Sequence, residues 1–502
     1  MNHALTALVS NLSYGEVPGY GGGEKTNGFV ETLAQVYEKA RNALEYRADN
    51  LVRRAAIERI LKRRMLINKD PRSLARHLLM ELEWARYLAH EEIKEAKRVE
   101  LEAVLSKYTS QLNGAVPTSW IVKIASAEIE EVFNLNTDYR LFTLYAFQVM
   151  KQKVAINDKN LDLLVYFAVD KVYAGGDDEQ ILYHILRLGG ENVTAEKLTE
   201  AYRLYNLAKE HKDLPRIIKF VRRQMPPLVL LRDMYFYNPA VFKTTLRSRE
   251  VFEVKAREVL NTQLDLMSGK IRTAGTRSVI YVFLTKMILA FGLEVPLETL
   301  FYGHVGLLPL LLNLGFPPAL MWITTMQIRI PPKKDQDALI LRTVEIMQNF
   351  ERLKNEEDVL RESGAEPSGS PSYIIFSAFY LIFFFGVFAL IFIALGKIDF
   401  TLFSKAMFIF FLSIIAFFAY RIVQIAKIYS WKGMGRRGST LMEIVSLPIL
   451  AIGSRLSVGL SKLNFLAFTF DFILEAPFKI ILGLVDSWVQ FISAKREEQI
   501  IE

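Results

Sequence analysis

The stretch Tyr373–Leu395 reads YIIFSAFYLIFFFGVFALIFIAL and contains no charged side chain in its twenty-three positions. At about 1.5 Å of rise per residue, a helix of this length can cross a bilayer hydrocarbon core of about 30 Å. No comparable stretch occurs in the first 270 residues, which are rich in Lys, Arg, Glu and Asp. The sequence therefore predicts a membrane protein with a large water-soluble part ahead of its membrane part.

Two further apolar segments predict additional membrane helices. Residues 401–425 lead back after a tight loop, so 373–427 is predicted to be a transmembrane hairpin. Residues 278–326 form a first membrane hairpin, which either spans the bilayer twice or enters and leaves on one side. Its second half is uncharged but contains four polar or helix-breaking positions, Pro309, Asn313, Pro317 and Pro318. A charged cytoplasmic linker, 327–372, separates the two hairpins.

The rest of the chain also has helical periodicity, so the predicted fold class is all-α. We expect a flexible leader at 1–28, a long helical hairpin or coiled-coil-like segment at 29–112, and a helical domain at 118–270. Turn residues divide that domain into helices at 118–133, 137–153, 158–173, 178–188, 194–212, 215–224 and 247–268. Residues 441–496 predict amphipathic helices that lie on the membrane, with a third transmembrane pair as the alternative. Within this segment the small residues Gly453, Ser457 and Ser461 are four positions apart, which predicts a helix face that packs closely against another helix.

The basic residues that flank the apolar segments predict the orientation. They collect on one predicted side, at Arg329, Lys333, Lys334, Lys427, Lys432, Arg436 and Arg437. The opposite loops, predicted at 294–304 and 396–400, contain a single Lys or Arg residue, Lys397. Because Lys and Arg are enriched in cytoplasmic loops, the N-terminal region is predicted to be cytoplasmic. We expect a multi-pass protein of a prokaryotic cell membrane.

Composition argues against several classes of function. The chain has no cysteine, and none of its six histidines pairs with another at helical spacing, so we predict no metal site and no cofactor. No nucleophile–base pair is recognisable, so an enzyme is not the favoured interpretation. The net charge of +8 fits basic loops at a membrane. The densest basic run, 53–64, is more typical of a solvated helix face than of a nucleic-acid site.

One stripe of residues in the first membrane hairpin carries candidate chemistry. Lys286, Glu294 and Glu298 are spaced by multiples of four, so they lie on one side of a helix. An ammonium near the middle of a bilayer costs about 2.5–3.5 kcal/mol on insertion scales and usually faces a partner or water. Asn313 in the proline-rich second helix is the predicted partner, and together these four residues predict an ion or substrate pathway. The alternative is that Lys286 only reaches to the interface, with Val295-Pro296 turning the chain out of the membrane.

The sequence leads to two functional hypotheses. The first is a membrane-anchored scaffold or assembly factor, which presents its helical region to protein partners or to a second copy of itself. The second is a channel or transporter that uses the ionisable residues of the first membrane hairpin. The expected partners are the lipid bilayer and other proteins.

Overall fold

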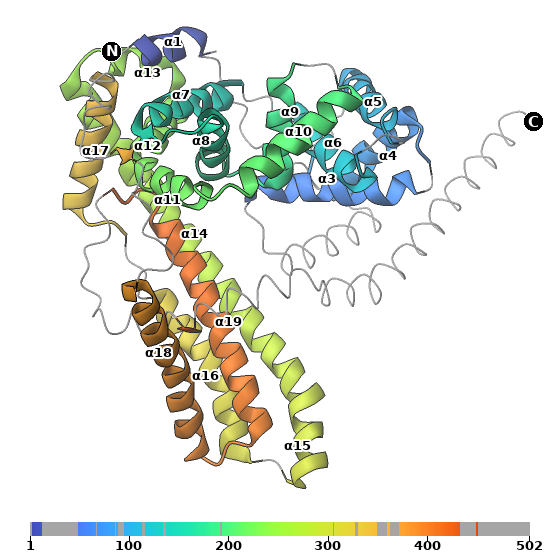
Figure 1. Cartoon of the computed structure of the whole chain (residues 1–502), viewed down its shortest axis with the longest axis vertical. Coiled ribbons are helices and arrows are strands. Elements are labelled where there is room, and N and C mark those ends of the chain that lie inside the picture. The colour runs from blue at the N-terminus through green and yellow to red at the C-terminus, as the bar shows by residue number, and fades with distance from the viewer. Residues whose placement is uncertain are drawn as a thin grey trace, which may run out of the picture. The chain divides into compact units, whose positions relative to one another are not determined.

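The computed structural model describes residues 3–12, 49–66, 68–85, 87–88, 95–112, 116–133, 137–190, 193–304, 306–326, 330–348, 359–361, 371–431 and 448–449. Over these ranges the chain is nearly all helical, as predicted (Figure 1). It divides into two compact units. The first unit comprises residues 1–9 and 223–463, and the second comprises residues 10–222 and 464–502.

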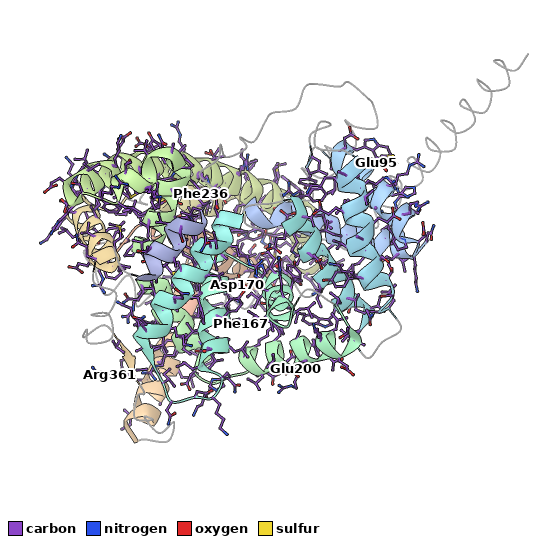
Figure 2. All side chains as sticks on the ribbon, turned by 90° about the horizontal axis from the view of Figure 1, so that it is seen from above. Glu95, Phe167, Asp170, Glu200, Phe236 and Arg361 are labelled. Atoms are coloured by element: carbon purple, nitrogen blue, oxygen red, sulfur yellow. The ribbon has the colours of Figure 1, made fainter. Side chains whose placement is uncertain are left out.

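The second unit is a bundle of short helices around its own apolar core. In chain order its elements are α3 (Asp49–Met65), α4 (Pro71–Trp84), α5 (Glu95–Thr109), α6 (Thr118–Phe133), α7 (Thr137–Lys153), β1 (Val154–Ala155), α8 (Leu161–Val169), the π turn η2 (Asp170–Ala174), α9 (Asp178–Leu188), α10 (Ala195–Lys209) and the greater part of α11 (Leu214–Gln224). In Figure 2 Phe167 and Asp170, each 1% exposed, lie in the interior of these helices, whereas Glu95 and Glu200 lie at the edge.

The first unit contains the long apolar helices. In chain order its elements are α1 (His3–Asn11, of which residues 3–9 belong here), α12 (Pro226–Tyr237), α13 (Pro239–Thr245), α14 (Arg249–Leu289), the π turn η3 (Ala290–Glu294), α15 (Val295–Tyr302), α16 (Leu307–Met326), α17 (Lys333–Gln348), β2 (Leu360–Arg361), α18 (Pro371–Gly396) and α19 (Leu402–Ala426). Helices α14, α16 and α19 pack against one another, and α18 contacts α19 (Figure 1). The N-terminal half of α14 packs against α12 and α17.

Close approach of two helices depends on a glycine in α14. A Cβ atom added to Gly275 would collide with the Cγ2 atom of Thr325 near the end of α16. Any larger residue at position 275 would therefore force α14 and α16 apart. On the same helix, Gly269 has open space around its Cα, so this constraint is local to the crossing.

Most helix boundaries in the second unit agree with the sequence. The predicted helices 118–133, 137–153 and 178–188 match α6, α7 and α9 residue for residue. Asp70 caps α4, and its Oδ2 atom accepts a hydrogen bond of 2.8 Å from the Ser73 N–H. Such local signals determine where these helices begin and end because capping acts within one turn.

Three expectations from the sequence are corrected. Residues 3–11 form helix α1, whose Leu5 and Leu8 are buried, rather than belonging entirely to a flexible leader. Residues 294–302 are helical rather than a loop, because Pro296 falls in the first turn of α15, where a missing N–H is tolerated. The charged segment 327–372 contains α17, whose apolar face is buried.

Candidate functional site

The candidate site is a group of buried polar side chains between α14, η3, α15, α16 and α19. The Nζ atom of Lys286 lies 3.0 Å from the Oε2 atom of Glu294, and neither side chain is exposed. The ammonium also lies 4.8 Å from the centre of the Phe411 ring on α19, which adds a cation–π contact. Lys286 therefore lies inside the helical bundle and not on its surface.

The second carboxylate oxygen of Glu294 binds two neutral side chains. Its Oε1 atom accepts a hydrogen bond from the Asn313 Nδ2 group of α16 and lies 2.6 Å from the Ser404 Oγ atom of α19. Asn313 is fully buried, and Ser404 is 1% exposed. Side chains from three helices thus converge on one carboxylate, which accounts for the burial of so many polar groups in an apolar bundle.

Glu298 joins the group through the same serine. Its Oε1 atom lies 2.5 Å from the Ser404 Oγ atom and also accepts a hydrogen bond from the Thr401 hydroxyl, just before α19. The Thr401 Oγ1 atom in turn accepts the Ser404 N–H at 3.1 Å. Ser404 therefore lies between two carboxyl groups, each within hydrogen-bonding distance of its hydroxyl oxygen.

The π turn explains how residues eight positions apart meet. In a regular helix Glu294 would be rotated by about 80° from Lys286, at about 100° per residue. In η3 the Val295 N–H bonds to the Ala290 carbonyl, five residues earlier, so one extra residue is accommodated. That extra residue turns Glu294 back toward Lys286. Pro296 favours the π turn because its ring would clash with the carbonyl four residues earlier in an unbroken α-helix.

A second helix irregularity lies beside Asn313. Pro317, inside α16, has no N–H to donate to the Asn313 carbonyl four residues earlier, so that carbonyl lacks its usual helical partner. The Asn313 side-chain Oδ1 atom is buried, and no hydrogen-bond donor reaches it within the described chain. The site therefore offers more acceptors than donors.

The structure describes three of the basic residues that the sequence predicts to lie at the membrane surface. Lys333 and Lys334 lie exposed at the start of α17, and Lys427 lies exposed just after α19. These two places are neighbours, because the Asp335 carboxylate accepts hydrogen bonds from the Ser430 hydroxyl at 2.8 Å and the Trp431 N–H at 3.3 Å. The remaining predicted surface and packing residues lie outside the described ranges: Arg329, Lys432, Arg436, Arg437, Gly453, Ser457 and Ser461.

The end of α19 is fixed by a buried tyrosine. The Tyr429 hydroxyl donates a hydrogen bond of 2.6 Å to the Asp233 carboxylate of α12. Burial and the neighbouring Asp233 charge both raise the pKa of Tyr429 above its ordinary value, so this tyrosine stays protonated as a donor. The contact joins the apolar helices to the polar part of the same unit.

Three members of the site were not predicted from the sequence: Thr401, Ser404 and Phe411. The available signal was a pair of hydroxyl residues, three positions apart, at the start of a mainly apolar helix. Over the described residues, no group of three or more His, Cys, Asp or Glu side chains is arranged to hold a metal ion. Comparison with known protein families, with characterised proteins and with solved structures gave no significant match, so the functional argument depends on the geometry of the site.

Proposed function

We propose that the protein is a multi-pass membrane protein that passes a small cation through the Lys286–Glu294 site. The observation that carries this proposal is the ion pair at 3.0 Å, fully buried among apolar helices. Ionisable residues inside a membrane are costly and rarely serve packing alone, and they commonly mark ion pathways or proton relays. Transporters commonly build ion sites where membrane helices are irregular, and α16 is irregular where Pro317 removes a helical hydrogen bond.

Helix lengths support a membrane location for this bundle. Three helical segments are long and apolar enough to cross a bilayer: a stretch within 249–302, 307–326 and 378–396. Only 6% of the apolar stretch of α18 is buried, so its Phe, Leu and Ile side chains need an apolar environment beyond what the described residues provide. We propose that α19, with 25 residues, provides a fourth crossing.

The proposed orientation places the second unit in the cytoplasm, because Lys333, Lys334 and Lys427 share one end of the bundle. A chain without cysteine permits a direct test by single-cysteine labelling. An impermeant maleimide added to intact cells should label Lys397→Cys in the α18–α19 turn. It should label Glu200→Cys in α10 only after the cells are permeabilised. Labelling of Glu200→Cys in intact cells would contradict this orientation.

The transport proposal is tested by flux into liposomes that contain the purified full chain. Lys286→Met should lower cation flux by at least tenfold, because the variant leaves the Glu294 charge without its partner. The matched control is Lys255→Met on the same helix, where the lysine is exposed and pairs with Glu258 at 2.7 Å. Equal flux for the two variants, or no flux of any common cation through the wild-type protein, would count against the proposal.

A membrane-anchored scaffold is the second candidate, and one observation favours it. The second unit forms a compact helical body with its own apolar core, and it contains none of the residues of the candidate site. A body of this kind is suited to presenting a surface to protein partners or to another copy of the chain. Crosslinking followed by mild solubilisation should recover defined partners or a homo-oligomer. Recovery of a monomer without partners would contradict this candidate.

A further inference from the structure

The hydrogen-bonding pattern around Ser404 identifies a feature of the site beyond its ion pair. A serine hydroxyl has one proton, and an ionised carboxylate can only accept hydrogen bonds. The Ser404 Oγ atom nevertheless lies 2.6 Å from the Glu294 Oε1 atom and 2.5 Å from the Glu298 Oε1 atom. One proton shared between two acceptors gives two weakened bonds, so two contacts this short are satisfied best when one of the two carboxyl groups carries a proton of its own.

The other hydrogen bonds decide which carboxyl group that is. Glu294 accepts a hydrogen bond from Asn313 and forms the ion pair with Lys286, and both contacts favour its ionised form. Glu298 has two hydroxyl neighbours and no cation within ion-pair distance over the described residues. A proton on Glu298 therefore donates to Ser404, and Ser404 donates to Glu294.

The charge balance supports the same assignment. With both carboxyl groups ionised, the buried site would hold one positive and two negative charges. One added proton makes it neutral, which is the favourable state in surroundings of low dielectric constant. The unpartnered Asn313 Oδ1 atom is an independent sign that the site has fewer protons than acceptors.

The short contacts have the length of charge-assisted hydrogen bonds. Separations of 2.5 and 2.6 Å are those of O–H···O hydrogen bonds to carboxyl groups. The other charged groups nearby do not offset the charge of Glu298. Lys405 of α19 lies over the Phe392 ring of α18, and Lys397 and Asp399 are exposed in the α18–α19 turn.

We propose that this site binds a proton on Glu298, with Ser404 as the residue that relays it to Glu294. The relay rests on the proposed function, because it names the proton as the transported cation. Proton binding at Glu298 does not require that the protein transports anything. The step is a concerted transfer of two protons along the two hydrogen bonds, in which two O–H bonds break and two form. The Glu298 O–H transfers its proton to the Ser404 oxygen as the Ser404 proton passes to Glu294, so no other reactant is needed.

Infrared spectroscopy of the full chain in lipid nanodiscs tests proton binding directly. We expect a protonated-carboxyl band that shifts in D₂O, because the proposed proton on Glu298 exchanges for deuterium. The band should disappear in Glu298→Gln, whose amide can still donate to Ser404 and so preserves the packing. It should persist in the control variant Glu258→Gln, which alters an exposed residue of α14. Absence of the band from the wild-type protein, or its persistence in Glu298→Gln, would overturn the proposal.

Liposomes under a pH gradient separate this inference from the transport proposal. Proton uptake by the wild-type chain, reduced at least tenfold in Glu298→Gln and in Ser404→Ala, supports the relay. Flux of another cation without proton movement overturns the relay but leaves cation transport intact. An infrared band without any flux supports the proton site and contradicts the transport function.

Discussion

Replacement of Lys286 by methionine is the sharpest test of the buried ion pair. The two charges are 3.0 Å apart and fully buried. At an effective dielectric constant of about 20, this separation gives an attraction of about 5 kcal/mol. Removal of one partner from a buried pair costs about 3–5 kcal/mol, because the remaining charge stays desolvated. We expect Lys286→Met to lower the free energy of unfolding by about 3–5 kcal/mol.

The assay is unfolding of the full chain in mixed micelles, followed by circular dichroism and analysed as a double-mutant cycle. Glu294→Gln added to Lys286→Met removes the orphan charge, and its side-chain oxygen still accepts the bonds from Asn313 and Ser404. The double variant should recover to within about 1 kcal/mol of the wild type, because a buried pair and a neutral replacement often have similar stability. A loss below about 1 kcal/mol in Lys286→Met, with additive effects in the double variant, would refute the reasoning.

Three other predictions concern packing and ionisation in the first and second units. Gly275→Ala should destabilise the chain by about 1–3 kcal/mol through its clash with α16, whereas Gly269→Ala on the same helix should be neutral or stabilising by up to about 1 kcal/mol in the same unfolding assay. Tyr429→Phe should cost about 1.5–3 kcal/mol, since Asp233 loses a buried donor; an unchanged unfolding midpoint would contradict this role. Burial lowers the pKa of His184 and its Asp170 partner raises it more, so the net pKa is raised. The charged form of His184 therefore contributes fully to the free energy of unfolding below pH 6.5. This contribution is lost as the pH rises through the raised pKa of His184 in the folded state. Hydrogen exchange in α9, corrected for intrinsic rates, should show His184→Gln to be destabilising at about pH 6 and harmless at high pH.

Local signals in the sequence were sufficient to predict most helices. Turn and cap residues act within a single helical turn, so α6, α7 and α9 could be delimited residue for residue. Residues 294–302 were expected to be a loop because Glu294 and Val295-Pro296 are typical of a chain leaving the membrane. Tertiary packing reversed that expectation, since Glu294 and Glu298 find partners on α16 and α19 and remain inside the bundle.

Four of the seven residues of the candidate site were predicted from the sequence. Helical spacing placed Lys286, Glu294 and Glu298 on one side, and the proline-rich helix made Asn313 a natural partner. Ser404 could not be identified in this way, because more than a hundred residues separate it from Glu298 and periodicity carries no information over that distance. The spacing of apolar residues also did not predict the π turn, although Pro296, which favours it, is visible in the sequence.

The charges of the site are not explained by helix packing alone. Neutral Asn, Ser and Thr side chains join membrane helices with hydrogen bonds at about 0.6–2 kcal/mol each, without the desolvation penalty of an ion. Lys286, Glu294 and Glu298 occupy the position where two helices are already weakened, by the π turn before Pro296 and by Pro317 beyond Asn313. If the group served stability only, apolar residues of similar volume would serve at least as well, because replacing a buried ion pair in that way is often neutral or stabilising. Titratable groups beside the π turn, with Glu294 bonded to Asn313 next to the second irregular point, are instead an arrangement in which a change of protonation can alter how the helices pack, and the proposed cation transport requires such a change.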